Sequence, residues 1–195
     1  VANTGSAGNN TVTLTVNNTT VSSLYLNSGF FAAGTNQTLR IAAGGNIYGN
    51  GANNPNNATA GNIEFLGNGT TQGFSTGNPL LYSVILNGGV DFNGATPHSA
   101  TIMNRLQLNS GSFVTDAPYY QTGSSLVYNT GGTYGRNAEW GSLSNQGYPY
   151  HVIVQGNTVL DLNTNAISLA RLELLGDLVI GNANGKGQVY LNNNM

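Results

Sequence analysis

The sequence contains no cysteine, few charges and no long apolar run, and each absence excludes a class of protein. Without cysteine the chain has neither a disulfide framework nor a thiolate metal site. Only 6% of the residues are charged, and the net charge is −2, so there is no basic surface to neutralise nucleic-acid phosphates. No apolar run approaches the length needed to cross a bilayer, and we expect no direct membrane insertion.

Acidic side chains are equally scarce, which limits acid–base chemistry. A glycosidase needs two carboxylates at a defined separation across one bond. Asp91, Asp116 and Asp161 follow their nearest apolar triplets at different distances, so we do not expect them to stack on one face of a repeat. The seven carboxylates are Glu64, Asp91, Asp116, Glu139, Asp161, Glu173 and Asp177. We therefore predict that the chain is not an enzyme.

Metal binding and ice binding also lack the side chains that they need. His98 and His151 are too few and too far apart for a metal cluster. Segment 181–187 is the nearest match to the calcium-binding Gly-Gly-x-Gly-x-Asp repeat, but it has no carboxylate. A Thr-x-Thr-x-Thr alternation begins at Thr11, yet no other repeat continues the column that an ice-binding face needs. We predict no cofactor.

Glycine and asparagine, by contrast, are abundant, with 28 and 31 copies. Both favour turns over helix interiors, so we expect little or no helix. The 39% of hydrophobic residues recur in nine apolar–x–apolar triplets, each of which runs into a small polar turn. These triplets lie at 24–26, 39–41, 63–65, 84–86, 106–108, 126–128, 151–154, 172–174 and 189–191. Their mean spacing of roughly 21 residues is typical of a solenoid or array.

Each repeat reads as strand, tight turn, strand and loop. The second apolar segments lie at 30–31, 90–92, 112–114, 158–162 and 178–180. Equivalent strands can stack in parallel as a β-helix, or pair as antiparallel hairpins in a meander or sandwich. Asn27, Asn87, Asn109, Asn129 and Asn192 recur at one phase, as expected if their amides stack from coil to coil. We predict an all-β parallel β-helix, or β-solenoid, of about nine coils with roughly 21 residues per coil.

Two stretches interrupt the repeat and are predicted to be loop insertions, at 44–62 and 133–150. The remainder is expected to form a single β-solenoid segment over residues 1–195. Because the sequence opens at Val1 and stops as another repeat begins near 191–195, we expect it to be part of a longer repeat protein.

Aromatic residues cluster in the second insertion and just before it, and Arg136 lies among them. Their rings could stack on sugars or anchor a protein partner, or they could pack the long loop onto the rod. The surrounding glycines and prolines favour packing. The candidate contact residues are Tyr119, Tyr120, Tyr134, Arg136, Trp140, Tyr148 and Tyr150, and Tyr128 lies in the same stretch.

Segment 124–140, SSLVYNTGGTYGRNAEW, and the following GYPYHV resemble a recurring passage in large secreted β-strand-repeat surface proteins of Bacteroidota. The flanking repeats, such as 106–115 and 157–162, are similar to those of the same proteins. The resemblance implies an adhesin-like protein at the cell surface or released from the cell. It also implies export through the outer membrane by the type IX secretion system, and it implies no catalytic residue.

We therefore expect a non-enzymatic structural or adhesin-like segment, located outside the cell or at its outer surface. The alternative is a β-helix that binds or cleaves carbohydrate, with Trp140 and its tyrosine neighbours as the contact surface. Other surface proteins, glycans or the export machinery are the possible partners. Exposed strand edges at the ends of a solenoid also favour end-to-end or lateral self-association.

Overall fold

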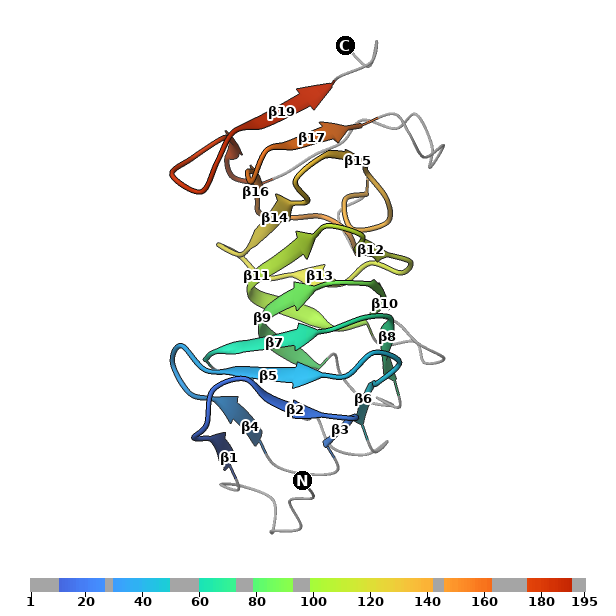
Figure 1. The fold of residues 1–195 in the computed structure, drawn as a ribbon, viewed down its shortest axis with the longest axis vertical. Coiled ribbons are helices and arrows are strands. Elements are labelled where there is room, and N and C mark those ends of the chain that lie inside the picture. Colours follow the sequence, from blue (N-terminus) through green and yellow to red (C-terminus); the bar gives the residue numbers. More distant parts are fainter. Residues whose placement is uncertain are drawn as a thin grey trace.

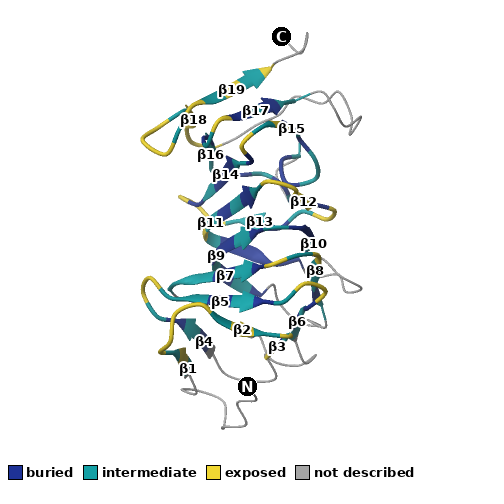
Figure 2. Cartoon of the chain, in the orientation of Figure 1, coloured by how far each residue is buried: buried dark blue, intermediate teal, exposed yellow. Residues whose placement is uncertain are grey.

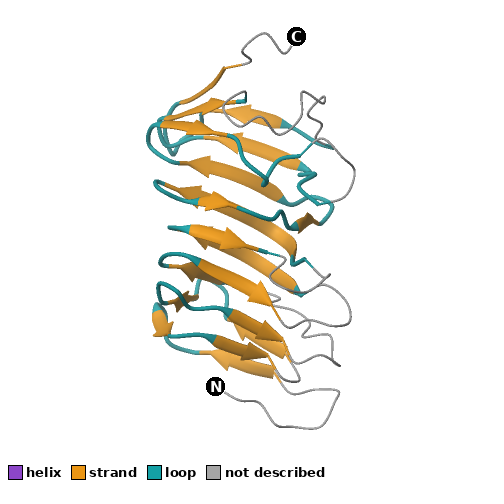
Figure 3. Cartoon of the chain, turned by 90° about the vertical axis from the view of Figure 1, so that its right-hand side faces the viewer, coloured by secondary structure: helices purple, strands orange, loops and turns teal. Residues whose placement is uncertain are grey.

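The computed structural model describes residues 11–26, 30–49, 60–72, 79–92, 99–141, 146–162 and 175–190. Every regular element within these ranges is a β-strand, which confirms the all-β class. The strands are stacked as rungs along one elongated axis, with β1 towards one end and β19 towards the other (Figures 1 and 3).

One long sheet of nine strands runs along the stack. Eight strands follow one another in the order β18-β16-β14-β11-β9-β7-β5-β2, and β13 pairs with β11. All of these strand pairs are parallel, so the chain is a β-solenoid and the antiparallel hairpin arrangement is wrong. The strands are β2 (Thr19–Val21), β5 (Thr38–Ile41), β7 (Asn62–Phe65), β9 (Leu80–Leu86), β11 (Thr101–Asn109), β13 (Tyr119–Tyr120), β14 (Ser125–Asn129), β16 (His151–Val154) and β18 (Leu178–Ile180).

Shorter sheets form the other sides of the coils. A five-stranded sheet contains β3 (Leu24–Leu26), β6 (Ile47–Gly49), β8 (Gly69–Gln72), β10 (Gly89–Asp91) and β12 (Phe113–Val114). A three-stranded sheet contains β15 (Thr133–Gly135), β17 (Thr158–Asp161) and β19 (Gly187–Tyr190). A two-stranded sheet pairs β1 (Thr11–Leu14) with β4 (Phe30–Ala33).

The solenoid has about six turns, fewer than the nine predicted. Six of the predicted triplets are aligned neighbours in the long sheet, from 39–41 to 151–154. Triplet 24–26 is instead β3, triplet 189–191 overlaps β19, and 172–174 lies outside the described residues. The prediction overcounted because an apolar–x–apolar triplet marks a strand in any sheet of the coil, and its position around the coil depends on tertiary register.

Two of the predicted second strands also have different positions from those expected. Segment 30–31 belongs to β4, which pairs with β1, and segment 178–180 is β18, which extends the long sheet. The observed coil length agrees better with the prediction than the number of coils does. Register partners are 20 residues apart for Val21 and Ile41, and 26 residues apart for Tyr128 and Val154.

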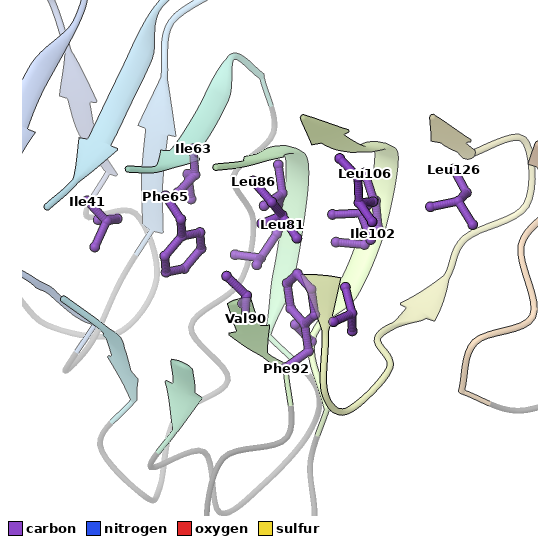
Figure 4. Close-up of a cluster of buried hydrophobic side chains, with 14 of the residues drawn as sticks. Ile41, Ile63, Phe65, Leu81, Leu86, Val90, Phe92, Ile102, Leu106 and Leu126 are labelled. Atoms are coloured by element: carbon purple, nitrogen blue, oxygen red, sulfur yellow. The ribbon is translucent and has the colours of Figure 1, made fainter. Parts of the chain in front are cut away.

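The core consists of apolar columns that run from coil to coil, because in-register stacking puts the inward residue of each strand on its neighbour. One column is Ile41, Phe65, Leu86, Leu108, Tyr128 and Val154, and these side chains are completely buried. Figure 4 shows Phe65 and Leu86 pointing towards Val90 and Phe92, which come from the β10 side. Burial is continuous through the middle of the rod, whereas β18 is exposed and β19 alternates between half-buried and exposed residues (Figure 2).

The corners use the residues that tolerate a left-handed backbone. Among the described residues, the three non-glycine positions with positive φ are all asparagine, Asn18, Asn36 and Asn157. Gly69 serves a different purpose, because a Cβ there would lie 2.5 Å from the Gly45 carbonyl oxygen and 2.7 Å from the Phe65 ring. The missing side chain therefore makes room for the Phe65 ring in the column.

Parts of both predicted insertions have regular structure. Segment 44–62 includes β6 and the first residue of β7, and its residues 50–59 lie outside the described part. Segment 133–150 opens with β15, and the structure describes it except for 142–145.

Candidate functional site

An asparagine ladder lines one edge of the long sheet, at the ends of β9, β11 and β14. The Asn129 side-chain amide donates to Asn109 Oδ1 at 3.2 Å, and the Asn109 amide donates to Asn87 Oδ1 at 2.9 Å. The predicted stacking of these three amides is confirmed. Asn27 and Asn192, which were predicted to join them, lie outside the described residues.

The ladder ends on an ion pair that fixes its direction. The Asn87 amide donates to Glu64 Oε1 at 3.0 Å and to the Phe65 carbonyl at 3.1 Å. Glu64 Oε2 in turn accepts from Arg40 Nε at 2.8 Å. Because an ionised carboxylate only accepts, every amide of the ladder must donate towards Glu64. Glu64 is thus a structural group whose two oxygens are both engaged.

The predicted aromatic contact residues divide into a buried group and a half-buried group. Tyr134 is 9% exposed, Arg136 is 4% exposed and Trp140 is 3% exposed. Tyr119, Tyr120, Tyr148 and Tyr150 are half-buried. The ring of Tyr150 packs edge-on against His151, with centroids 4.7 Å apart. The rings of Tyr134 and Trp140 belong to the hydrophobic core and cannot reach a ligand in this conformation.

A buried carboxyl, Glu139, lies at the centre of the buried aromatic group. Tyr128 takes the place that Leu86 and Leu108 hold in the preceding coils, and its hydroxyl donates to Glu139 Oε1 at 3.1 Å. The hydroxyl of Tyr120 donates to the Glu139 carbonyl oxygen at 2.9 Å. We call Tyr120, Tyr128, Tyr134, Arg136, Glu139 and Trp140 the Glu139 cluster. The sequence prediction omitted Glu139, although a lone carboxyl among aromatic residues was a signal for it.

Burial controls the protonation of this cluster. Loss of hydration raises the pKa of the Glu139 carboxyl from its ordinary 4.5 to about 7, although its hydrogen bonds and the charge of Arg136 act in the opposite direction. Burial also raises the pKa of the Tyr120, Tyr128 and Tyr134 hydroxyls, and the nearby carboxyl raises them further. The tyrosines therefore stay neutral donors throughout the physiological range.

The other acidic and histidine side chains that the structure describes lie apart from one another, except for His151 and Asp177. In the five-stranded sheet Asp91 is the register partner of Thr70, and in the three-stranded sheet Asp161 is the register partner of Gly135 and Tyr190. None of these register partners is acidic. Within the described ranges, no group of three or more histidine or acidic residues is placed to hold a metal ion. His151 Nδ1 accepts from the Asp177 amide at 2.9 Å, and His98 lies outside the described residues.

Two surface features were not foreseen from the sequence. Tyr25 and Tyr48 stack outside the rod with centroids 4.7 Å apart and an interplanar angle of 12°, and Tyr25 is 51% exposed. A cavity of about 190 Å³ lies at the β1 end, lined mainly by Val12, Leu14, Val21, Leu24, Phe31 and Leu39. The cavity lining is apolar or hydroxyl-bearing, so it offers no acid or base for catalysis.

Comparison with known proteins gives no relative for the chain. No protein-family model, curated protein or solved structure matches it. Among the described residues there is also no helix long and apolar enough to span a membrane. The functional argument therefore depends on the geometry of the rod itself.

Proposed function

We propose that the chain is a non-enzymatic, adhesin-like structural segment of a secreted or cell-surface protein, exported by the type IX secretion system. Its β-solenoid acts as a spacer that holds other modules away from the cell. The observation that carries the proposal is the long parallel sheet, whose buried columns and asparagine ladder link successive coils in register.

The chemistry of the described surface supports a mechanical role. Glu64 is engaged by Arg40 and the ladder, and Glu139 is completely buried. Neither carboxyl is therefore available to a substrate in this conformation. A stack of coils instead transmits load through hydrogen bonds between parallel rungs, each of which contacts only its neighbours.

Surface location is tested with antibodies raised against this chain and applied to the cells that make it. We expect intact cells to be labelled, and mild treatment with external protease to remove the label. Labelling that appears only after the cells are permeabilised contradicts the proposed location. Surface labelling that persists when type IX secretion is inactivated contradicts the proposed export route.

Carbohydrate binding is a second candidate, favoured by the exposed ring of Tyr25, which stacks on the half-buried ring of Tyr48. An exposed aromatic ring can stack on the apolar face of a sugar, and the Asn46 side-chain amide donates to the Tyr48 hydroxyl at 2.9 Å beside it. A glycan array probed with the wild-type chain, Tyr25→Ser and the turn variant Ser110→Ala separates the two functions. Specific binding lost in Tyr25→Ser alone replaces the spacer proposal, whereas absence of specific binding supports it.

A further inference from the structure

The Glu139 cluster contains three buried side-chain atoms that make no hydrogen bond within the described residues, namely Glu139 Oε2, the Tyr134 hydroxyl and Arg136 Nε. Glu139 Oε1 accepts from the Tyr128 hydroxyl and from the Asn137 backbone amide, at 3.1 and 2.9 Å. The second oxygen, Oε2, and the Tyr134 hydroxyl are both buried, and neither makes a hydrogen bond to a described residue. Leaving such atoms unpaired is costly, so the arrangement implies a missing proton or a rearrangement.

Of the groups that face the carboxyl, Arg136 carries a positive charge that lowers the pKa of Glu139, but burial raises that pKa by more. Tyr120, Tyr128 and Tyr134 approach from β13, β14 and β15, and all three are neutral donors. Arg136 approaches from the loop after β15, and its Nη1 donates to the Trp140 carbonyl oxygen at 2.6 Å. Among the described residues, Arg40 pairs with Glu64, and His151 Nδ1 lies 3.5 Å from an Asp177 carboxylate oxygen, so neither contact involves the Glu139 carboxyl.

We propose that Glu139 is a proton-controlled latch for the loop that carries Trp140. In the latched state the carboxyl is neutral and its proton on Oε2 is shared with the Tyr134 hydroxyl, which satisfies both of these atoms. When that proton is lost to solvent, the carboxylate requires water, and segment 136–141 moves away from the rod. The inference does not depend on the proposed spacer function, because it concerns one loop and its protonation.

The contacts of the segment explain why the latch acts locally. The contacts that hold residues 136–141 include the Tyr120 hydroxyl on the Glu139 carbonyl oxygen, the Arg136 amide on the Asp161 carbonyl oxygen and the Gly141 amide on the Gly147 carbonyl oxygen. The apolar columns of the long sheet contact the Glu139 cluster through one member, Tyr128, whose ring lies in the column and whose hydroxyl donates to Glu139 Oε1. The other column residues lie on strands that make no hydrogen bond to Glu139. Opening therefore uncovers the aromatic rings of Tyr134 and Trp140 while the coils stay stacked.

The direction of the pH effect follows from linkage. The pKa of Glu139 is about 7 in the closed state, against an ordinary value of 4.5 when the carboxyl is exposed. Its contribution to the closed state is therefore fully present below pH 4.5 and is lost as the pH rises through 7. The difference corresponds to a change on the order of a few hundredfold in the closed-to-open equilibrium.

The single tryptophan of the chain reports directly on the latch. We expect the emission maximum of Trp140 to shift to the red, and acrylamide quenching to increase, between pH 5 and pH 9 with a midpoint near pH 7. Glu139→Gln, which stays neutral, is expected to abolish the transition.

Controls separate the latch from other titrations. Glu64→Gln and His151→Asn are expected to retain the wild-type transition, since those side chains lie outside the cluster. If Glu139→Gln does not fold, ¹³C side-chain NMR of the wild-type glutamates gives the same test, with one carboxyl titrating near pH 7. The proposal is overturned if no glutamate titrates above pH 6, if Trp140 emission is constant, or if the transition persists in Glu139→Gln.

Discussion

Replacing Asn109 with alanine tests how much the asparagine ladder stabilises the rod. Its amide donates to Asn87 Oδ1 at 2.9 Å and accepts from Asn129 Nδ2 at 3.2 Å and from Gln107 Nε2 at 2.9 Å. A hydrogen bond contributes about 1 kcal/mol net in a folded protein. Because these amides are half-buried, water replaces part of what is lost. We therefore expect Asn109→Ala to lower the free energy of unfolding by about 2 kcal/mol.

An Asn109→Asp variant separates hydrogen-bond direction from side-chain size. The ionised carboxyl still accepts from Asn129 and Gln107, but it has no hydrogen to donate to Asn87 Oδ1. Two hydrogen-bond acceptors then face each other. Asn87 cannot reverse its amide without losing its bonds to Glu64 and Phe65. We expect a loss of about 1–3 kcal/mol at pH 7, which is regained as the introduced carboxyl takes a proton and can donate. Its pKa is raised in the folded state, so its contribution is present at low pH and lost as the pH rises.

Urea unfolding followed by far-ultraviolet circular dichroism measures both effects. Each variant is compared with the wild type at pH 7 and at pH 3.5, because other carboxyls also titrate. Ser110→Ala, an exposed change in the same turn, is the control and should stay within about 0.5 kcal/mol. If both Asn109 variants match the wild type at pH 7, the ladder contributes nothing beyond what water supplies, and the reasoning is wrong.

Other features of the rod give two further tests. Gly69→Ala should lower the free energy of unfolding by about 1–3 kcal/mol, because its Cβ would collide with the Phe65 ring and the Gly45 carbonyl oxygen. Gly132→Ala is the control and should be neutral, because a Cβ there meets nothing within 4 Å. Equal effects of the two substitutions in urea unfolding would contradict this prediction. The exposed terminal strand β18, in which Ile180 is 50% exposed, should promote self-association. Light scattering should then show Ile180→Lys to be more monomeric, and a monodisperse wild-type monomer would refute the idea.

Several elements of the fold were predictable because they depend on local pattern. Alternating apolar residues with glycine and asparagine corners specified short strands, and the spacing of Asn87, Asn109 and Asn129 specified their stacking. The spacing of the apolar triplets did not predict which sheet the first and last triplets join. Triplets 24–26 and 189–191 look like the others in sequence, yet they lie in different sheets because connecting segments of unequal length change the position of a strand around the coil.

The candidate site was only partly predictable, for a different reason. The aromatic cluster was visible in the sequence, but its exposure was not. Whether Trp140 faces solvent depends on how segment 136–141 folds back over β13 and β14, which brings Glu139 onto Tyr120 and Tyr128. The stacked pair of Tyr25 and Tyr48 was missed because the two residues are 23 positions apart and only the β3–β6 register aligns them.

The sequence by itself determined that this protein is an all-β solenoid with asparagine at its turns and little charge. It could do so because strand alternation and turn residues are encoded within a few neighbouring positions. Only the tertiary structure decided how many coils there are, which sheet each strand joins, and that Glu139 is enclosed among tyrosine hydroxyls. Those outcomes depend on the register between coils, and register is set by the packing of whole turns against one another.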